Sequence, residues 1–245
     1  VPVSMLPWEV SGTAGIVMIT TPDGAIKETA DKLAEYEGLR PGAVVLHCSG
    51  ALPSSELGAL RKIGARLGGF HPLQSFSAES LEQNPFSGIM VALEGDRQAV
   101  ETGRQMAEAL EAAPFQIETE KKLLYHASAV AASNYLVTLM NLAFQLIIAA
   151  GVPASSAFAI LKPLVSGTLS NIENAGIPRA LTGPVARGDV ETVAHHVKEI
   201  AAKAPTLLPL YLSLGRHTIE IALAKGDLSE EAAERLKSLF STPSS

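Results

Sequence analysis

The strongest constraint on the fold is a change of sequence pattern near Thr119. Before this point, short apolar β-branched runs alternate with segments of helical periodicity, which predicts a mainly parallel sheet covered by helices on both faces. The predicted strands are Gly15–Thr21, Ala43–His47, Arg66–Phe70, Ile89–Leu93 and Phe115–Glu118, and the predicted helices between them are Ala25–Tyr36, Ser54–Ile63 and Asp96–Ala112.

After Thr119 no strand signal remains. The predicted helices cover about 121–150, 154–174, 190–203, 205–224 and 229–240. Asp23, Asp189 and Ser229 are placed to cap helix N-termini, and Gly151, Gly176 and Gly226 to end helices. The pattern predicts an α/β domain over residues 1–119 and an all-helical domain over residues 120–245.

Composition narrows the class of protein. The net charge of −6 argues against nucleic acid or an anionic membrane as the main partner. Cys48 is the single cysteine, so no internal disulfide forms and a reducing compartment is expected. No signal peptide is visible. The helix predicted at 121–150 is long enough to cross a bilayer, but its Asn, Gln, Ser and His residues favour a soluble, cytoplasmic protein.

That helix carries one polar stripe. At 100° per residue the stripe spans roughly 60° of the helix surface, with His126 and Ser133 on its flank. Its members are Asn134, Thr138, Asn141 and Gln145. The stripe either faces a cleft and binds a polar ligand, or connects this helix to other helices by hydrogen bonds.

Polar residues follow three consecutive predicted strands, in the segments Thr20–Asp23, His47–Gly50 and His71–Gln74. Ligands of open parallel sheets bind beyond the carboxyl ends of the strands, so these segments are expected to share one rim. They supply hydroxyls, backbone N–H groups and an imidazole that titrates near neutral pH. Each segment alone is also what an ordinary turn contains.

Several familiar motifs are absent from the sequence: G-x-G-x-x-G, the Walker sequence and H-E-x-x-H. His195 and His196 lie on an amphipathic helix, where a solvated face is the favoured interpretation and no metal site is predicted. Ser49 is not in a G-x-S-x-G elbow, and a Ser49–His71 hydrolase pair is a minor alternative. In the segment LTGPVARGD, Arg187 either binds an anionic substrate or cofactor phosphate, or pairs with an acid in a turn capped by Thr182 and Asp189.

The motifs VMITTPDGAI, VVLHCSGAL, GGFHPLQSF, HASAVAASNYLVTLMN and LTGPVARGD occur in this order. With them the chain resembles Rossmann-like NAD(P)-dependent oxidoreductases that carry a helical C-terminal domain of unknown function, related to pyrroline-5-carboxylate reductases and β-hydroxyacid dehydrogenases. The resemblance implies a dinucleotide-binding domain, a helical domain that commonly dimerises, and an active site in the cleft between them. The cofactor would be NADP or NAD.

The resemblance also implies residue roles. Thr21, Pro22 and Asp23 would lie near the dinucleotide, and Ser49 and Gly50 would approach the nicotinamide. Asn134 matches an Asn on the first long interdomain helix of the dehydrogenases. Their Lys one turn earlier is Val130 here, so His71 or His126 becomes the candidate proton donor, with Gln74 and Arg187 as candidate substrate ligands.

In such proteins a strand and a glycine-rich turn would precede Val1, and without them the chain is expected to bind NADPH weakly or not at all. The leading hypothesis is an oxidoreductase acting on a small polar substrate, with His71, Asn134, Ser49 and His126 as catalytic residues. The alternative is a nucleotide-sensing or interaction module without turnover.

A two-fold homodimer through residues 121–240 is also expected, because this half carries more apolar helix surface than it can bury alone.

Overall fold

The computed structural model describes residues 5, 12–37, 39–76 and 84–241. The proline-containing start of the chain lies outside the described residues, apart from Met5, and so does the end of the Ser/Pro tail. The described chain divides into two compact units, residues 1–135 and 136–245. The sequence prediction had placed the domain boundary earlier, at Thr119, where the strand pattern stops.

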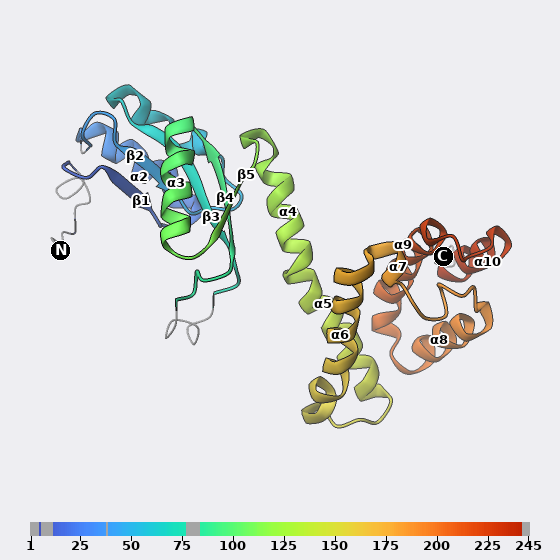
Figure 1. Ribbon diagram of the computed structural model, residues 1–245. Helices are drawn as coiled ribbons and strands as arrows, with labels where there is room; N and C mark the ends of the chain where they lie inside the picture. The colour runs from blue at the N-terminus through green and yellow to red at the C-terminus, as the bar shows by residue number, and fades with distance from the viewer. Residues whose placement is uncertain (1–4, 6–11, 38, 77–83, 242–245) are drawn as a thin grey trace. The chain divides into compact units, whose positions relative to one another are not determined.

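The first unit contains a five-stranded sheet in the order β1-β2-β3-β4-β5 (Figure 1). The strands are β1 Ile16–Ile19, β2 Val44–His47, β3 Arg66–Leu73, β4 Met90–Gly95 and β5 Ala113–Gln116. The helices between and after them are α2 Asp23–Glu35, the 3-10 helix η1 Ser54–Ile63, α3 Arg97–Ala109, the 3-10 turn η3 Thr119–Lys121 and α4 Lys122–Ala132. All strand pairs are parallel except β3 with β4. The predicted mainly parallel α/β sheet is therefore confirmed.

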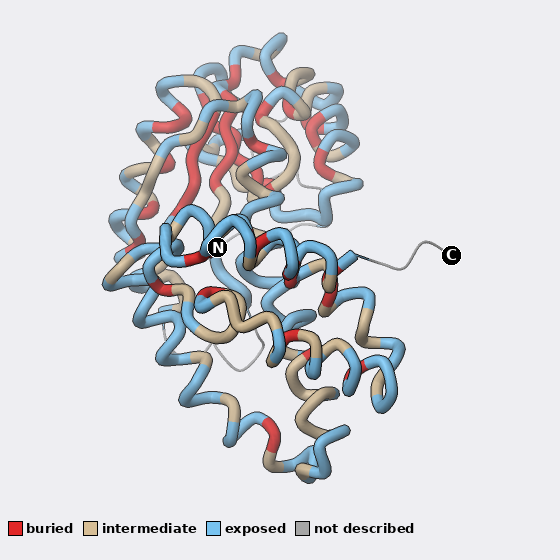
Figure 2. The backbone as a smooth tube through the Cα atoms, turned by 90° about the vertical axis from the view of Figure 1, so that its right-hand side faces the viewer, coloured by how far each residue is buried: buried red, intermediate tan, exposed pale blue. Residues whose placement is uncertain are grey.

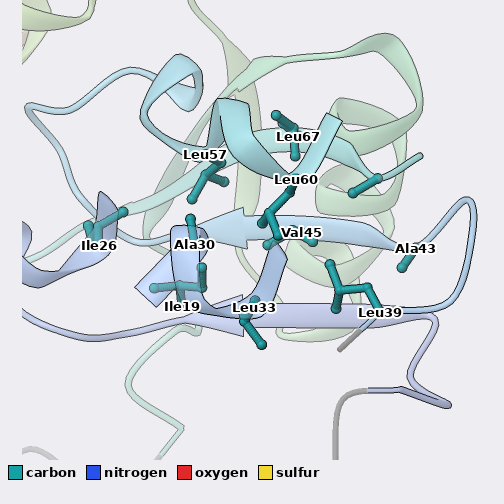
Figure 3. Packing of buried hydrophobic residues seen from close by; sticks show 11 residues of the cluster. Ile19, Ile26, Ala30, Leu33, Leu39, Ala43, Val45, Leu57, Leu60 and Leu67 are labelled. Atoms are coloured by element: carbon teal, nitrogen blue, oxygen red, sulfur yellow. The ribbon is translucent and has the colours of Figure 1, made fainter. Parts of the chain in front are cut away.

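Two apolar clusters hold helices on the two faces of this sheet. On one face α2 and η1 pack against β1, β2 and β3, through residues that include Ile26, Ala30, Leu33 and Leu57 (Figure 3). These α2 positions recur at helical spacing, as the sequence predicts. On the other face α3 packs against Leu46, Phe70 and Leu93. Burying each Ile or Leu side chain stabilises the fold by about 1.5–3 kcal/mol.

Strand β3 is longer than predicted and contains His71 within it. The reason is the antiparallel neighbour: β4 pairs with β3 as far as Leu73, so the strand continues past the ends of β1 and β2. In the parallel part, Ile19 pairs with His47 and His47 with Gly69. His71 therefore lies level with the loops that follow β1 and β2, on the rim where the sequence places the candidate site.

The second unit is helical in its described residues. Its elements are most of α5 Asn134–Ala149, α6 Ala154–Ala175, α7 Ile177–Ala180, α8 Val190–Lys203, the 3-10 turn η4 Pro205–Leu207, α9 Leu208–Lys225 and α10 Glu230–Phe240. The predicted caps are confirmed at Asp189 and Ser229, whose side chains accept hydrogen bonds from the N–H groups of Thr192 and Ala232. A buried cluster joins α8, α9 and α10.

Two local predictions were wrong. The helix expected over 121–150 is interrupted at Ser133, which separates α4 from α5. Asp23 does not cap its helix: it is already the first helical residue, after Pro22, and its carboxylate accepts a hydrogen bond from Ser49 instead.

Burial differs sharply between elements. Buried residues gather in the sheet and the helices packed on it (Figure 2), whereas α5 and α6 each bury a single residue, Leu142 and Ala157. Among the described residues, one segment, Thr119–Ala149, is long and apolar enough to cross a membrane by length and composition. The same segment contains the predicted polar stripe.

Candidate functional site

One face of the sheet carries two rows of side chains near the carboxyl ends of β1 and β2. Strand register aligns His47, Gly69 and Glu94 in one row. It aligns His71, Ala92 and Phe115 in the next. Residues two apart on a strand share a face, so Gly69 and His71 point to the same side. The first turns of α4 contact both rows.

Helix α4 reaches this face through Lys122, Tyr125 and His126. Their spacing of three and four residues places them on one side of a helix. Lys122 Nζ binds Glu94 Oε1 at 2.9 Å. Tyr125 packs edge-on against His71 and Phe115, with ring centroids 5.7 and 5.9 Å away, above the small side chain of Ala92. Residues on one face of α4 thus contact two neighbouring rows of side chains on the sheet.

The Lys122–Glu94 pair is fully buried, with 2% and 1% of the two side chains exposed. Ser54 donates its backbone N–H and its hydroxyl to Glu94, at 3.0 and 2.8 Å, and the Thr119 hydroxyl donates at 2.8 Å. Burial raises the pKa of Glu94, but Lys122 and these donors outweigh it and leave the pKa below its usual value. A buried carboxylate with four donors is stably ionised.

Gly69 makes room for this ion pair. A Cβ at that position would collide with Glu94 Oε1 and Lys122 Nζ. The Lys122 ammonium therefore lies directly on the backbone of β3, between Glu94 and His47. Burial, followed by the charge of Lys122, lowers the pKa of the fully buried His47 to about 4.

Two histidine nitrogens converge above Gly50. A Cβ on Gly50 would lie 2.7 Å from both His126 Nδ1 and His71 Nε2. The two imidazole centroids are 6.2 Å apart. His126 Nδ1 is buried and has no hydrogen-bond partner among the described residues. An unsatisfied buried polar atom costs about 1–3 kcal/mol, so this geometry favours a bound group that completes it.

The other nitrogen of His71 is held by Tyr125, since Nδ1 lies 2.8 Å from the Tyr125 hydroxyl. Burial, together with the charge of Lys122 and the neighbouring His126, lowers the pKa of His71 to about 4. Burial raises the pKa of Tyr125 to about 12. At neutral pH both groups are therefore uncharged.

The turn after β2 is fixed by Ser49. Its hydroxyl donates to Asp23 at 2.8 Å and accepts from the N–H groups of Ala51 and Leu52 at 3.2 and 2.9 Å. One donor and two acceptor positions are all that a hydroxyl offers. In this structure Ser49 thus shapes the Gly50 turn, and its proton goes to Asp23, not to His71 as a hydrolase pair would require.

A pocket of about 520 Å³ in the first unit brings several predicted residues together. His71, Gln74, His126 and Asn134 all line it, and so does Val130. Asn134 is exposed at the start of α5. The pocket therefore unites the candidate proton donors with two candidate ligands for polar groups of a substrate.

The remaining predicted residues lie elsewhere. Thr21 and Pro22 are exposed between β1 and α2, beside Asp23. Arg187 belongs to the second unit, in the connection between α7 and α8, where it contributes to the lowered pKa of Asp189 after the hydrogen bonds from Thr192. That position agrees with the interpretation of this segment as a turn. The role of Arg187 as a ligand stays a prediction.

Comparison with known proteins places this geometry in a family. Residues 89–218 match the family described as "Domain of unknown function (DUF2520)". Protein TM1727 from Thermotoga maritima is 30% identical in sequence, with a TM-score of 0.71 over 89% of this chain and 82% of that chain. No curated protein matches the chain.

Two more distant structures share the fold. A Bacteroides fragilis protein, provisionally named an NADP oxidoreductase, is 23% identical, with a TM-score of 0.69 over 89% of this chain and 80% of that chain. Pyrroline carboxylate reductase from Plasmodium falciparum, solved with NADP bound, is 10% identical, with a TM-score of 0.55 over 97% of this chain and 82% of that chain. The resemblance seen in the sequence motifs is thereby confirmed: the chain belongs to the DUF2520 family, a Rossmann-like family with a helical C-terminal part that is related in fold to NADP oxidoreductases.

Proposed function

We propose that this protein is an NAD(P)-dependent oxidoreductase that moves hydride between the nicotinamide and a small polar substrate. The observation that carries the proposal is the convergence of His71 Nε2 and His126 Nδ1 above Gly50, at the rim of a Rossmann-like sheet. Related folds include a reductase solved with NADP bound. Rossmann-like sheets bind their ligands at the carboxyl ends of strands, where these atoms lie.

The residues at this rim fit the reacting end of a dinucleotide. The two imidazoles lie against the backbone of Gly50, where a Cβ would collide with both, and His126 Nδ1 is a buried polar atom without a hydrogen-bond partner among the described residues. Thr21, Pro22 and Asp23 are exposed at the same rim and would line the path of the cofactor. When bound, NAD(P) supplies or accepts the hydride at a substrate carbon.

The chain's own residues then have separate tasks. His71 Nε2 holds the substrate oxygen and exchanges a proton with it, as a general acid or base within hydrogen-bond reach. His126 Nδ1 makes a second contact to the same oxygen. Asn134 and Gln74 bind other polar groups of the substrate in the 520 Å³ pocket. Ser49, whose hydroxyl is fully engaged, orients the Gly50 turn.

One observation favours a second candidate, a nucleotide-sensing or interaction module without turnover. Val130, at the position of the Lys of related dehydrogenases, lines the pocket, so no ammonium group is available there as a proton donor. Such a module would bind NADPH and show no hydride transfer with any substrate. Both candidates would therefore bind NADPH, but only the oxidoreductase would convert a substrate.

Substitution of His71 tests the enzymatic proposal. With NADPH and a panel of small ketones and imines, His71→Ala should lower kcat by about 10²–10⁴-fold with little change in melting temperature, because the proton donor is lost. His195→Ala, on the exposed side of α8, is the matched control and should leave kcat unchanged. Turnover by His71→Ala at the wild-type rate would remove His71 from the chemistry. NADPH binding without turnover of any substrate would favour the sensing module.

We further propose that the protein is a soluble, cytoplasmic homodimer formed through residues 121–240. The support is the exposure of large apolar side chains on α5 and α6, including Val137, Phe158, Ile160 and Leu164. Exposed apolar surface of this extent usually marks an interface. A dimer would also shelter the apolar segment Thr119–Ala149 from water.

A further inference from the structure

We propose that Tyr125 and His71 form a proton relay, and that the relay ends on the oxygen of a ketone or secondary alcohol held in the 520 Å³ pocket that His71 and His126 line. This inference rests on the proposed oxidoreductase function and specifies its substrate class. The relay consists of the Tyr125 hydroxyl, then His71 Nδ1, then His71 Nε2. Tyr125 acts through His71 and is therefore a positioning and proton-supplying residue that does not touch the substrate.

The geometry places Tyr125 between two pockets of the first unit. His71 lines the 520 Å³ pocket together with His126. Tyr125 lines a second pocket of about 780 Å³, formed largely by residues 116–121 and 124. The 2.8 Å contact between His71 Nδ1 and the Tyr125 hydroxyl links His71 to a residue that lines the second pocket. A proton can thus pass from solvent on one side to the substrate on the other.

The relay requires one direction of this hydrogen bond, with the Tyr125 hydroxyl as the donor. If Tyr125 donates, its proton reaches His71 Nδ1, the sole hydrogen-bond partner found for this hydroxyl among the described residues. If His71 Nδ1 donated instead, the phenol would give its proton to water in the second pocket, and no proton would pass from Tyr125 to His71. Donation by Tyr125 puts the imidazole proton on Nε2. Nε2 lies next to the backbone of Gly50, and because His71 lines the 520 Å³ pocket, its Nε2–H group can donate to an oxygen bound there.

A neutral imidazole needs such a partner to act as an acid. If Nε2–H gave up its proton alone, an imidazolate would remain. Because Tyr125 can deliver a proton to Nδ1 as Nε2 loses one, the imidazole stays neutral throughout. In the reducing direction, hydride adds to the carbonyl carbon, the C=O π bond opens, and the oxygen takes the Nε2 proton. Water in the second pocket returns a proton to Tyr125, so one solvent proton is consumed for each ketone reduced by NADPH.

The two converging nitrogens also select the substrate. With Nε2–H as a donor and His126 Nδ1 as an acceptor, an alcohol oxygen satisfies both, since a hydroxyl accepts and donates. A carbonyl oxygen accepts from Nε2–H. An amine product is protonated at neutral pH and has no lone pair for Nε2–H. The site therefore fits a ketone–alcohol pair better than an imine–amine pair.

The test measures the tautomer of His71 in the full chain by nitrogen-15 NMR of labelled histidines, without cofactor or substrate. The wild type should carry the His71 proton on Nε2. Tyr125→Phe keeps the ring that packs on Phe115 but loses the hydroxyl, and it should shift His71 towards a mixture of tautomers. Tyr211→Phe is the matched control, because it removes the other Tyr–His contact, 3.0 Å to His196 Nδ1, and should leave His71 unchanged.

Kinetics provides the second readout. Tyr125→Phe should lower kcat for ketone reduction about tenfold, as expected for loss of one well-placed hydrogen bond, while Tyr211→Phe should not. If His71 of the wild type carries its proton on Nδ1, the relay is overturned. This measurement uses the wild type alone and does not depend on whether a variant folds. Unchanged ketone kcat in a folded Tyr125→Phe also overturns it, and preferred reduction of imines overturns the substrate class. The expected tautomers without NADPH turnover would leave the relay geometry intact and refute the proposed function.

Discussion

At the scale of single residues, the sequence identified the groups that lie at a strand end or on a polar stripe. His71, His126, Asn134 and Gln74 were found in this way and line one pocket. The sequence reasoning missed Tyr125, Glu94, Lys122 and the structural role of His47. Their partners lie far away in the sequence: Lys122 pairs with Glu94, and Tyr125 contacts His71. The one local signal was the spacing of Lys122, Tyr125 and His126, which puts them on one face of a helix.

The buried imidazole of His47 predicts a pH dependence of stability. Its pKa is about 4 in the folded protein and about 6.5 when unfolded, so between these values the unfolded chain binds more protons. The stabilisation is fully present above pH ~6.5 and is lost as the pH falls towards 4, amounting to about 3 kcal/mol. Urea unfolding at several pH values should show this loss.

His47→Asn is the informative comparison. An Asn side-chain oxygen can still accept the Ser49 N–H that now binds His47 Nδ1 at 3.2 Å, but it does not titrate. The variant should lose less stability than the wild type between pH 6.5 and 4.5. Equal pH profiles for the two proteins would show that His47 titrates alike in the folded and unfolded states.

At the scale of elements, every predicted strand is present, and the predicted helical segments are helical except at Ser133. The segment Ser54–Ile63 is a 3-10 helix, and the other differences concern the ends of elements. Periodicity and turn residues predicted where the helices lie. The length of β3 instead depends on its antiparallel neighbour β4, which sequence periodicity does not specify. The interruption at Ser133 likewise has no Pro or Gly to announce it. The position of α4 depends on Gly69, because a Cβ at this residue would collide with the Lys122–Glu94 pair.

That ion pair should anchor α4 to the sheet. Lys122→Met would leave Glu94 charged and buried without its ammonium partner, and breaking such a pair costs about 3–5 kcal/mol. Lys121→Met is the matched control, since Lys121 is exposed and pairs with exposed Glu118, so its loss should change the free energy of unfolding by less than about 1 kcal/mol. Similar melting temperatures for the two variants would contradict an anchoring role.

At the scale of the whole molecule, the sequence predicted an α/β part followed by a helical part, and the family match supports this architecture. The first compact unit extends to Tyr135 and includes α4, whose Lys122 pairs with Glu94 of the sheet. Sequence pattern could not reveal this, since helical periodicity alone does not tell which unit a helix joins. The assembly state is likewise a prediction drawn from exposed apolar residues.

The homodimer has a direct test. Light scattering at micromolar concentration should give twice the monomer mass. Leu164→Glu should produce monomers, because it puts a charge on an exposed apolar face of α6. Lys62→Glu, an exposed change in η1, should leave the dimer intact. A wild-type monomer at this concentration would rule out the proposed interface.

The central claim is that NAD(P) binds with its reacting end beside His71 and His126 at the Gly50 turn. The most direct measurement is an NADPH titration of the chain with nitrogen-15 histidines, for which weak binding suffices. We predict saturable shifts at His71 and His126, none at His195 or His217, and loss of the shifts in Gly50→Ala, whose Cβ would lie 2.7 Å from both converging nitrogens. Unmoved His71 and His126 signals at saturating NADPH, or unchanged binding by a folded Gly50→Ala, would contradict the claim.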